Sequence, residues 1–258
     1  MIEKRNDGFH QIETVLYPIR LSDVFEAISC EGESQDVQFT TTGLEISGKP
    51  EHNLCVQAYQ LLKQDHHLKP VHIHLHKVIP MGAGLGGGSS DGAACINMLD
   101  ALFELDIANK QKLSYAAALG SDCIFFIDNR PAYAFERGEK LAYLKLDLSG
   151  YLLTLVCPDI HISTAEAYSG IIPQTPKKTL KKLIGLPVKA WRDCIINDFE
   201  LSVFARHPEI AEIKQKLYDL GAVYASMSGS GSSVYGIFSE KAGLKKAFPE
   251  CFVWEGEL

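Results

Sequence analysis

The stretch from Pro80 to Ala94, PMGAGLGGGSSDGAA, decides how the rest of this sequence is interpreted. Six of the 21 glycines lie between Gly82 and Gly92, after an alternating strand pattern and before a helix pattern. Glycine lets the backbone approach a ligand closely, and the N–H groups at a helix start favour an anion. The stretch therefore predicts a phosphate-binding loop rather than a plain glycine-rich turn. The side chains expected to cap the helix are Ser89, Ser90 and Asp91.

Two common phosphate-binding loops do not fit. Gly82-x-Gly84-x-x-Gly87 matches the dinucleotide fingerprint formally, but the strand before it alternates apolar residues with histidines. A central strand of a parallel doubly wound sheet is apolar on both faces, so the context excludes that fold. A Walker A loop needs a lysine just before its Ser or Thr, and no lysine lies between Lys77 and Lys110.

The pattern P-x-x-x-G-L-G-G-G-S-S-D, at Pro80 to Asp91, resembles the second motif of the GHMP kinases. Other segments follow in the family's order: Asp7-Gly8-Phe9-His10, Gly120-Ser121-Asp122, Arg137-Gly138-Glu139, Asn197-Asp198-Phe199-Glu200, and a third glycine motif at Ser226 to Ser232. Three glycines before the paired serines narrow the resemblance to members that phosphorylate the 2-hydroxyl of a cytidine-diphosphate-linked methylerythritol, in non-mevalonate isoprenoid biosynthesis. The resemblance implies a small-molecule kinase that uses ATP and Mg²⁺.

For ATP, the resemblance implies that the backbone N–H groups of Gly84 to Ser90 hold the phosphates, with Ser89 or Ser90 near Mg²⁺. Asn53 and Lys77 are implied at the nucleoside end, although Lys77 fits equally well a solvated charge at a strand end. The residues expected to bind the nucleotide are Asn53, Lys77, Pro80, Gly82, Gly84, Leu85, Gly86, Gly87, Gly88, Ser89 and Ser90. We expect the third glycine motif to fold against the phosphate loop.

For the acceptor, the resemblance implies that Asp122 takes the proton from the substrate hydroxyl, as a general base does. The alternative is an ordinary turn aspartate after the helix that ends near Gly120. His10 is implied in hydrogen bonding to cytosine, between the aromatic rings of Phe9 and Tyr168. Arg137 is implied near a substrate phosphate. The expected substrate-binding residues are Phe9, His10, Asp122, Arg137 and Tyr168.

Strands followed by helices, without strict alternation, indicate the α+β class. At Ser149-Gly150 the sequence changes from alternating strand patterns to an apolar strand followed by basic, proline-containing segments. This change predicts domains at 1–148 and 149–258. The resemblance implies a two-domain GHMP kinase fold, with an N-terminal half like the second domain of ribosomal protein S5 (ribosomal-protein-S5-domain-2-like) and a C-terminal ferredoxin-like half. We expect strands at 15–19, 24–28, 37–41, 71–78, 123–127, 152–157, 223–226 and 234–238, a hairpin within 132–146, and helices at 53–63, 90–105, 113–119, 190–204 and 209–220.

Composition limits the partners. With 25 basic and 32 acidic residues, the formal net charge of −7 disfavours a general nucleic-acid or anionic-membrane binder. No stretch approaches the ~18 apolar residues of a membrane span, and the polar start does not resemble a signal peptide. Seven scattered cysteines without a C-x-x-C pair predict reduced thiols and a cytoplasmic location. We expect a monomer or a weak homodimer.

Two further patterns leave alternatives open. His72, His74 and His76 share one strand face, which favours an exposed face over a metal site because metal ligands usually come from several elements. In the family, a strand resembling P-N-A-K-I-N-L-G-L, with a lysine implied in catalysis, precedes the D-G-F-H segment, and it is not in this sequence. We expect a trimmed or misassigned start, or else a non-catalytic nucleotide-binding relative. A GHMP kinase for another small alcohol is the third alternative.

Overall fold

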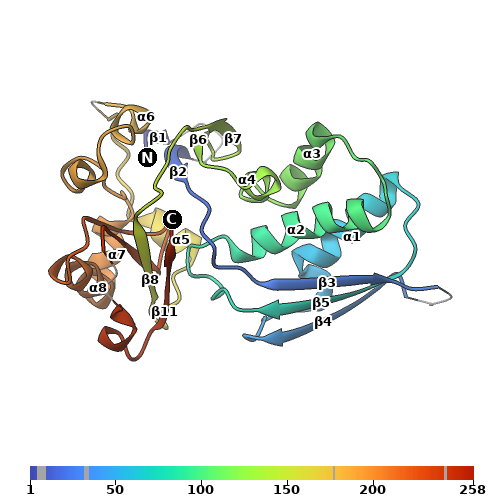
Figure 1. Ribbon diagram of the computed structural model, residues 1–258. Helices are drawn as coiled ribbons and strands as arrows, with labels where there is room; N and C mark the ends of the chain where they lie inside the picture. The colour runs from blue at the N-terminus through green and yellow to red at the C-terminus, as the bar shows by residue number, and fades with distance from the viewer. Residues whose placement is uncertain (5–9, 32–34, 177, 241–242) are drawn as a thin grey trace. The chain divides into compact units, whose positions relative to one another are not determined.

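The computed structural model describes residues 1–4, 10–31, 35–176, 178–240 and 243–258. This part of the chain divides into two compact units. Unit 1 comprises Met1–Leu21, Gly82–Leu85 and Pro131–Leu258, and unit 2 comprises Ser22–Met81 and Gly86–Arg130. The mixture of helices and strands confirms the α+β class (Figure 1). Each unit combines segments that are distant in the sequence. The units therefore do not test the predicted domain boundary near residue 148, which stays a prediction.

Unit 2 is built on a three-stranded sheet in which the central strand is antiparallel to one neighbour and parallel to the other. The strands, in spatial order, are β3 (Val24–Ser29), β5 (Val71–Lys77) and β4 (Val37–Gly43). Two long helices cover one face of the sheet (Figure 1). The helices and turns of this unit are η1 (Pro50–His52), α1 (Leu54–Asp65), α2 (Gly87–Leu102), α3 (Asn109–Leu119) and α4 (Cys123–Asp128).

The alternation in β5 explains how this unit forms its core. Val71, Ile73 and Leu75 are at most 1% exposed, while the histidines between them point to the opposite face. Their partners are buried side chains of the two long helices, among them Leu62 of α1 and Ile96 of α2. On that opposite face His76 is exposed, whereas His72 and His74 are half-buried, so the predicted exposed face is confirmed only in part.

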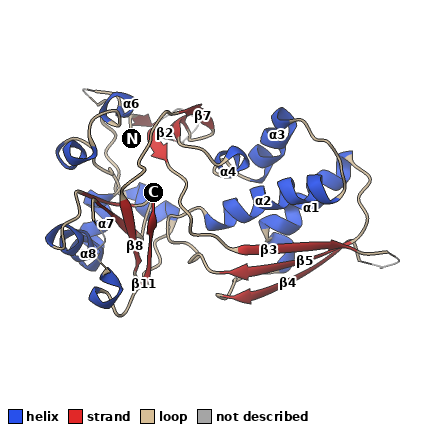
Figure 2. Cartoon of the chain, in the orientation of Figure 1, coloured by secondary structure: helices blue, strands red, loops and turns tan. Residues whose placement is uncertain are grey.

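Unit 1 contains two antiparallel sheets (Figure 2). One sheet has the order β1 (Glu3–Lys4), β2 (His10–Leu16), β6 (Ala132–Glu136) and β7 (Lys140–Tyr143). The other has the order β11 (Phe252–Glu257), β8 (Leu152–Cys157), β10 (Val234–Phe238) and β9 (Tyr224–Met227). The helices and turns of this unit are α5 (Thr164–Ser169), α6 (Leu180–Leu183), η2 (Val188–Asp193), α7 (Glu200–Arg206), α8 (Pro208–Asp219) and η3 (Leu244–Ala247). Helix α8 packs on β9 and β10, and α7 packs on α8.

Several sequence predictions need correction. The apolar run 123–127, predicted as a strand, is helix α4, because periodicity cannot separate helix from strand in so short a run. The helix predicted at 190–204 is interrupted between η2 and α7. There the Asn197 side chain accepts a hydrogen bond from the backbone N–H of Phe199 at 3.0 Å, a local bond that competes with helix formation. The sequence reading missed α5, α6 and β11. It also placed β2 too late, at 15–19 instead of His10–Leu16.

In the part of the chain that the structure describes, no helix has the length and apolarity needed to cross a membrane.

The core of unit 2 predicts a large effect for Leu62→Ala. Leu62 is fully buried, so the truncation leaves a cavity, and the free energy of unfolding should fall by about 3 kcal/mol. The exposed Gln60 on the same helix supplies the control, because Gln60→Ala should change stability by less than about 0.5 kcal/mol. Urea denaturation measures both variants. Equal stabilities of the two would contradict this description of the core.

Candidate active site

The first half of the glycine loop, in unit 1, packs backbone against backbone on the third glycine motif. Gly84 has a φ of +74°, and a Cβ atom there would lie 2.2 Å from the carbonyl oxygen of Ser228. The Ser228 hydroxyl donates a hydrogen bond of 2.8 Å to the Gly84 carbonyl, and the Ser233 N–H donates one of 3.2 Å to that of Ala83. The predicted contact between the two glycine motifs is therefore confirmed, and only glycine fits at position 84.

The second half of the loop, in unit 2, becomes the start of α2. Its N-cap is Gly86, in the left-handed conformation with a φ of 70°, and no side chain caps the helix. The predicted capping by Ser89, Ser90 and Asp91 is therefore wrong, because the helix begins at Gly87 and these residues lie within its first turns. The Ser90 N–H donates to the Gly86 carbonyl at 2.8 Å, whereas the N–H groups of Gly87, Gly88 and Ser89 have no acceptor inside the helix. They are thus available to an anion, which the helix dipole also favours.

Beneath this helix start lies a buried cluster of three charges. The Lys77 Nζ atom, at the end of β5, lies 2.5 Å from Asp23 Oδ2 and 2.8 Å from Asp91 Oδ2, and all three side chains are at most 8% exposed. Asp23 also accepts hydrogen bonds from the N–H groups of Val78 and Ile79, at 2.5 and 2.9 Å. The cluster therefore joins the end of β5 to α2. Lys77 is not a solvated strand-end charge.

The two carboxylates of this cluster differ in their electrostatics. Burial alone would raise the pKa of Asp23, but hydrogen bonds from Lys77, Ile79 and Val78 outweigh it, so the pKa is lowered. Burial dominates at Asp91 and raises its pKa to about 7, against the opposing attraction of Lys77. The sequence does not predict the role of Asp23, because an aspartate two residues after a leucine gives no local signal. It predicts Asp91 only as a cap.

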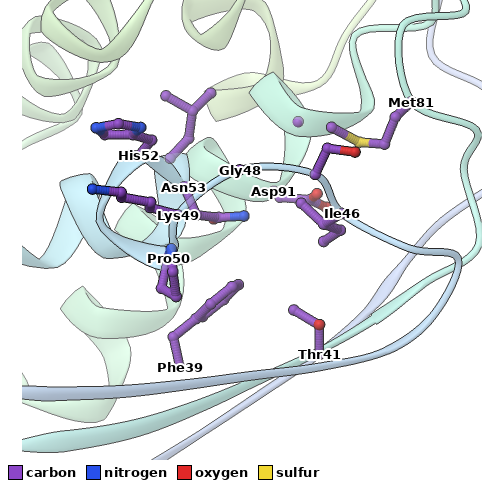
Figure 3. Close-up of a pocket in the computed structure, with 13 residues that line it drawn as sticks. Phe39, Thr41, Ile46, Gly48, Lys49, Pro50, His52, Asn53, Met81 and Asp91 are labelled. Atoms are coloured by element: carbon purple, nitrogen blue, oxygen red, sulfur yellow. The ribbon is translucent and has the colours of Figure 1, made fainter.

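A cavity of about 250 Å³ opens in unit 2 beside the start of α2. Figure 3 shows Phe39 and Thr41 of β4 on one side of it and His52 and Asn53 on another. The lining is mixed: apolar side chains such as Ile46 and Met81 alternate with polar groups, as in sites for small molecules. The residues that line it are Phe39, Thr41, Ile46, Ser47, Gly48, Lys49, Pro50, His52, Asn53, Leu54, Met81, Gly88 and Asp91.

Of the residues expected at the nucleoside end, Asn53 lies at this cavity and Lys77 does not line it. The Asn53 side chain accepts a hydrogen bond from the Cys55 N–H at 2.9 Å, which caps α1 and holds the amide in place. Gly88 and Asp91 complete the same wall. The cavity is therefore continuous with the uncapped helix start.

Asp122, in unit 2, stands at the N-terminal end of α4. Its side chain keeps solvent-exposed surface, yet surrounding protein atoms desolvate it and raise its pKa, while a hydrogen bond with Ser121 lowers it. The next residue, Cys123, is fully buried, and its thiol interacts with the Ser89 side chain. Asp122 thus directly precedes a residue whose side chain interacts with the first turn of α2. A raised pKa suits a carboxylate that must accept a proton.

Of the substrate residues expected in unit 1, two come together. The rings of His10 and Tyr168 lie 5.1 Å apart, tilted by 39°. Arg137 forms a pair with Glu139, its Nε atom 3.3 Å from the Glu139 carboxylate, so this arginine is partly neutralised. Phe9 lies outside the described residues. The roles of all these residues stay predictions.

The three histidines of β5 form a polar surface with β4. Thr40 and Thr42 hydroxyls contact the two nitrogens of His74 at 2.9 Å each, and Thr42 also contacts His76 at 2.9 Å. Threonine hydroxyls are thus the hydrogen-bond partners of His74 and His76 on this face. Within the residues that the structure describes, no group of three or more His, Cys, Asp or Glu side chains is placed to hold a metal ion.

Comparison with known proteins identifies the class. The family model of the GHMP kinases N terminal domain matches residues 53–130, and that of the GHMP kinases C terminal matches residues 179–251. These matches include the cavity wall at Asn53, the glycine loop, Asp122 and the third glycine motif. The chain belongs to the GHMP kinase family.

Within the family, two similar proteins bear the same name. A protein of Bacteroides fragilis named 4-diphosphocytidyl-2-C-methyl-D-erythritol kinase is 49% identical over 257 residues, which cover 99% of this chain and 94% of that protein. A protein of Porphyromonas gingivalis with the same name is 41% identical over 258 residues, 99% of this chain and 93% of the relative.

Solved structures agree on the fold. A crystal structure of 4-(cytidine 5'-diphospho)-2C-methyl-D-erythritol kinase matches with a TM-score of 0.84 and 27% identity, covering 98% of this chain and 92% of that one. A homoserine kinase from Cytophaga hutchinsonii matches with a TM-score of 0.70 at 17% identity, over 96% of this chain and 95% of that one, and shows the shared fold alone. The two-domain GHMP kinase fold expected from the sequence is confirmed.

The buried charge cluster predicts that Lys77→Met destabilises the protein. Removing the ammonium leaves two buried carboxylates uncompensated, so the free energy of unfolding should fall by about 3 kcal/mol or more. Lys69 supplies the control, because its ion pair with Glu31 is exposed and Lys69→Met should leave the unfolding midpoint nearly unchanged. Guanidinium denaturation measures both. A Lys77→Met variant as stable as the native chain would contradict a stabilising role for the cluster.

The contact between the glycine motifs predicts opposite effects at two glycines. Gly84→Ala places a methyl group against the Ser228 carbonyl in a left-handed backbone, which alone costs about 1 kcal/mol or more, so the melting temperature should fall. At Gly88 a Cβ atom meets nothing within 4 Å, and Gly88→Ala within α2 should leave the melting temperature unchanged or higher. Differential scanning calorimetry compares them. Equal decreases of the melting temperature in the Gly84→Ala and Gly88→Ala variants would contradict the prediction.

Proposed function

We propose that this protein transfers the γ-phosphoryl group of ATP to the 2-hydroxyl of 4-diphosphocytidyl-2-C-methyl-D-erythritol. The observation that carries the proposal is the 49% identity, over 99% of the chain, to a relative that bears the name of this kinase. The arrangement of the glycine loop supports it, because an uncapped helix start next to a small-molecule cavity suits a nucleotide polyphosphate.

In this proposal the ATP phosphates lie on the N–H groups of the loop and of the first turn of α2. Phosphoryl transfer depends mostly on position and charge stabilisation, and fixed backbone donors supply both. The adenine ring occupies the cavity beside Asn53, where apolar side chains contact its faces. Gly84 to Ser90 thus act as a preorganised cradle, supported from below by Lys77 and its two carboxylates.

Mg²⁺ fits this site as a companion of ATP rather than as an ion in a protein cage. Magnesium often keeps several waters and binds through substrate phosphates with one or two protein oxygens. The Ser89 and Ser90 hydroxyls, in the first turn of α2, are oxygen donors of this kind. When bound, the ion neutralises charge that develops on the phosphates during transfer.

Asp122 is proposed as the general base. Its carboxylate accepts the proton of the substrate 2-hydroxyl as that oxygen bonds to the γ-phosphorus, and the bond to the bridging oxygen breaks to release ADP. A carboxylate whose pKa is raised by desolvation is a stronger base than a free aspartate. Ser121, which hydrogen-bonds this carboxylate, orients it.

The cytidine end of the substrate is proposed to bind in unit 1, at the ring pair of His10 and Tyr168. An aromatic ring stacked on a base contributes about 1–3 kcal/mol, so this pair would favour a nucleotide-linked alcohol over a bare one. Arg137 is proposed near a substrate phosphate. The cytoplasmic location, the monomeric or weakly dimeric state and the absence of nucleic-acid or membrane partners remain part of this proposal.

The test is turnover by the purified chain. Supplied with Mg-ATP, it should release ADP with the cytidine-diphosphate methylerythritol and not with homoserine or mevalonate, and phosphorus NMR should place the new phosphate on the 2-hydroxyl. Turnover of homoserine or mevalonate instead would refute the proposed substrate. ATP binding without turnover of any of them would show a non-catalytic nucleotide-binding protein.

The proposed base predicts a specific pH dependence. Because Asp122 must be ionised to accept a proton and its pKa is raised, kcat/KM should fall with decreasing pH at higher pH values than for an ordinary aspartate. Asp122→Asn should lower kcat about a hundredfold or more and abolish that acid limb. The exposed Asp106 supplies the control, and Asp106→Asn should leave both kcat and the profile unchanged. An intact acid limb in Asp122→Asn would exclude this role.

A further inference from the structure

The segment Asn197-Asp198-Phe199-Glu200 follows η2 and ends at the first residue of α7, and the proposed reaction gives it no role. Its asparagine lies against the third glycine motif. The Asn197 Nδ2 atom donates hydrogen bonds to the carbonyl oxygens of Met227 and Gly229, each at 2.8 Å. One side chain therefore holds the backbone on both sides of Ser228, the residue whose carbonyl and hydroxyl contact Gly84.

The last residue of the segment fixes the strand that leads into the same motif. Glu200 is only 5% exposed and accepts a hydrogen bond from the Met227 N–H at 2.9 Å and one from the Ser226 hydroxyl at 3.2 Å. Its second oxygen accepts from Lys214 Nζ of α8 at 2.6 Å, so the buried charge is paired. Asn197 and Glu200 thus anchor the end of β9 and the motif that follows.

Phe199, the third residue of the segment, contacts the ring of Tyr168. It is 8% exposed, and its ring packs edge-on against Tyr168, with the centroids 4.9 Å apart and the planes at 76°. Tyr168 in turn contacts His10. Edge-on aromatic pairs prefer a defined orientation, so Phe199 restricts the orientation of the Tyr168 ring.

We propose that Asn197, Phe199 and Glu200 form one positioning element within unit 1, in which Asn197 and Glu200 fix the glycine motif that supports the phosphate loop and Phe199 orients the ring that receives the substrate base. The base-orienting part rests on the proposed function, whereas the phosphate-loop part requires only ATP binding. None of the three residues is assigned contact with either substrate. Asn197 and Glu200 act through the glycine motif around Ser228, and Phe199 acts through Tyr168.

The two halves of the proposal predict opposite kinetic signatures. Asn197→Asp keeps the acceptor for the Phe199 N–H and removes both donated bonds, so the Kd for Mg-ATP should rise about tenfold while the KM for the cytidine substrate stays within about twofold. Phe199→Leu should raise the KM for the cytidine substrate about fivefold and leave the Kd for Mg-ATP within about twofold.

Matched controls separate these effects from a loss of packing or a change of charge. Phe204→Leu removes an aromatic ring from the adjacent helix α7, where the ring faces Lys214 Nζ at 5.9 Å, and should change neither constant. Asn129→Asp makes the same chemical change at an exposed position of unit 2, and should also change neither. Phe199→Tyr keeps the ring and should hold the KM within about twofold of the native value.

The decisive experiment is a double-mutant cycle on the full chain. Mg-ATP affinity is measured by calorimetry and substrate KM by ADP release, with thermal melting of each variant. If Phe199 acts through Tyr168, adding Phe199→Leu to Tyr168→Leu should not raise the substrate KM further. Additive effects, or an Asn197→Asp variant with native Mg-ATP affinity, would overturn the inference. A native chain that binds Mg-ATP without turning over the substrate would refute the proposed function, and the Asn197 measurement would still test the phosphate-loop half.

Discussion

The Ser228 carbonyl oxygen occupies the space that any side chain at position 84 would need. This contact brings the phosphate loop and the third glycine motif together as bare backbone, with one hydroxyl bond from Ser228 to Gly84 and one N–H bond from Ser233 to Ala83. A glycine loop is costly in conformational entropy unless it is held, and here a second loop holds it. The result is a stretch of backbone fixed before any ligand arrives.

The same principle operates at the start of α2. Gly86 takes the left-handed conformation, no side chain caps the helix, and Lys77 with Asp23 and Asp91 fixes its first turns from below. Because the cluster pairs one ammonium with two carboxylates, it supplies little positive charge of its own. A protein with a net charge of −7 can therefore bind a polyphosphate only through local donors and a cation that accompanies the nucleotide.

Much of the fold and of the site could be predicted from the sequence, for identifiable reasons. The glycine spacing that predicts a phosphate loop and the alternation of β5 between apolar residues and histidines both reflect local geometry. The contact between the glycine motifs followed from the resemblance to the family. Other features depend on distant partners: Asp23 joins Lys77 across 54 positions of sequence, and no local pattern announces that pair. The short apolar run that forms α4 is ambiguous for a different reason, because periodicity cannot separate a helix from a strand in so short a run.

The most direct measurement of the central claim is amide hydrogen exchange of the chain with and without Mg-ATP. If the backbone N–H groups of the loop and of the first turn of α2 hold the phosphates, exchange at residues 84–90 should slow markedly when the nucleotide is bound, with a smaller effect at the motif after β9. Saturating Mg-ATP binding that leaves exchange at residues 84–90 unchanged would contradict the account.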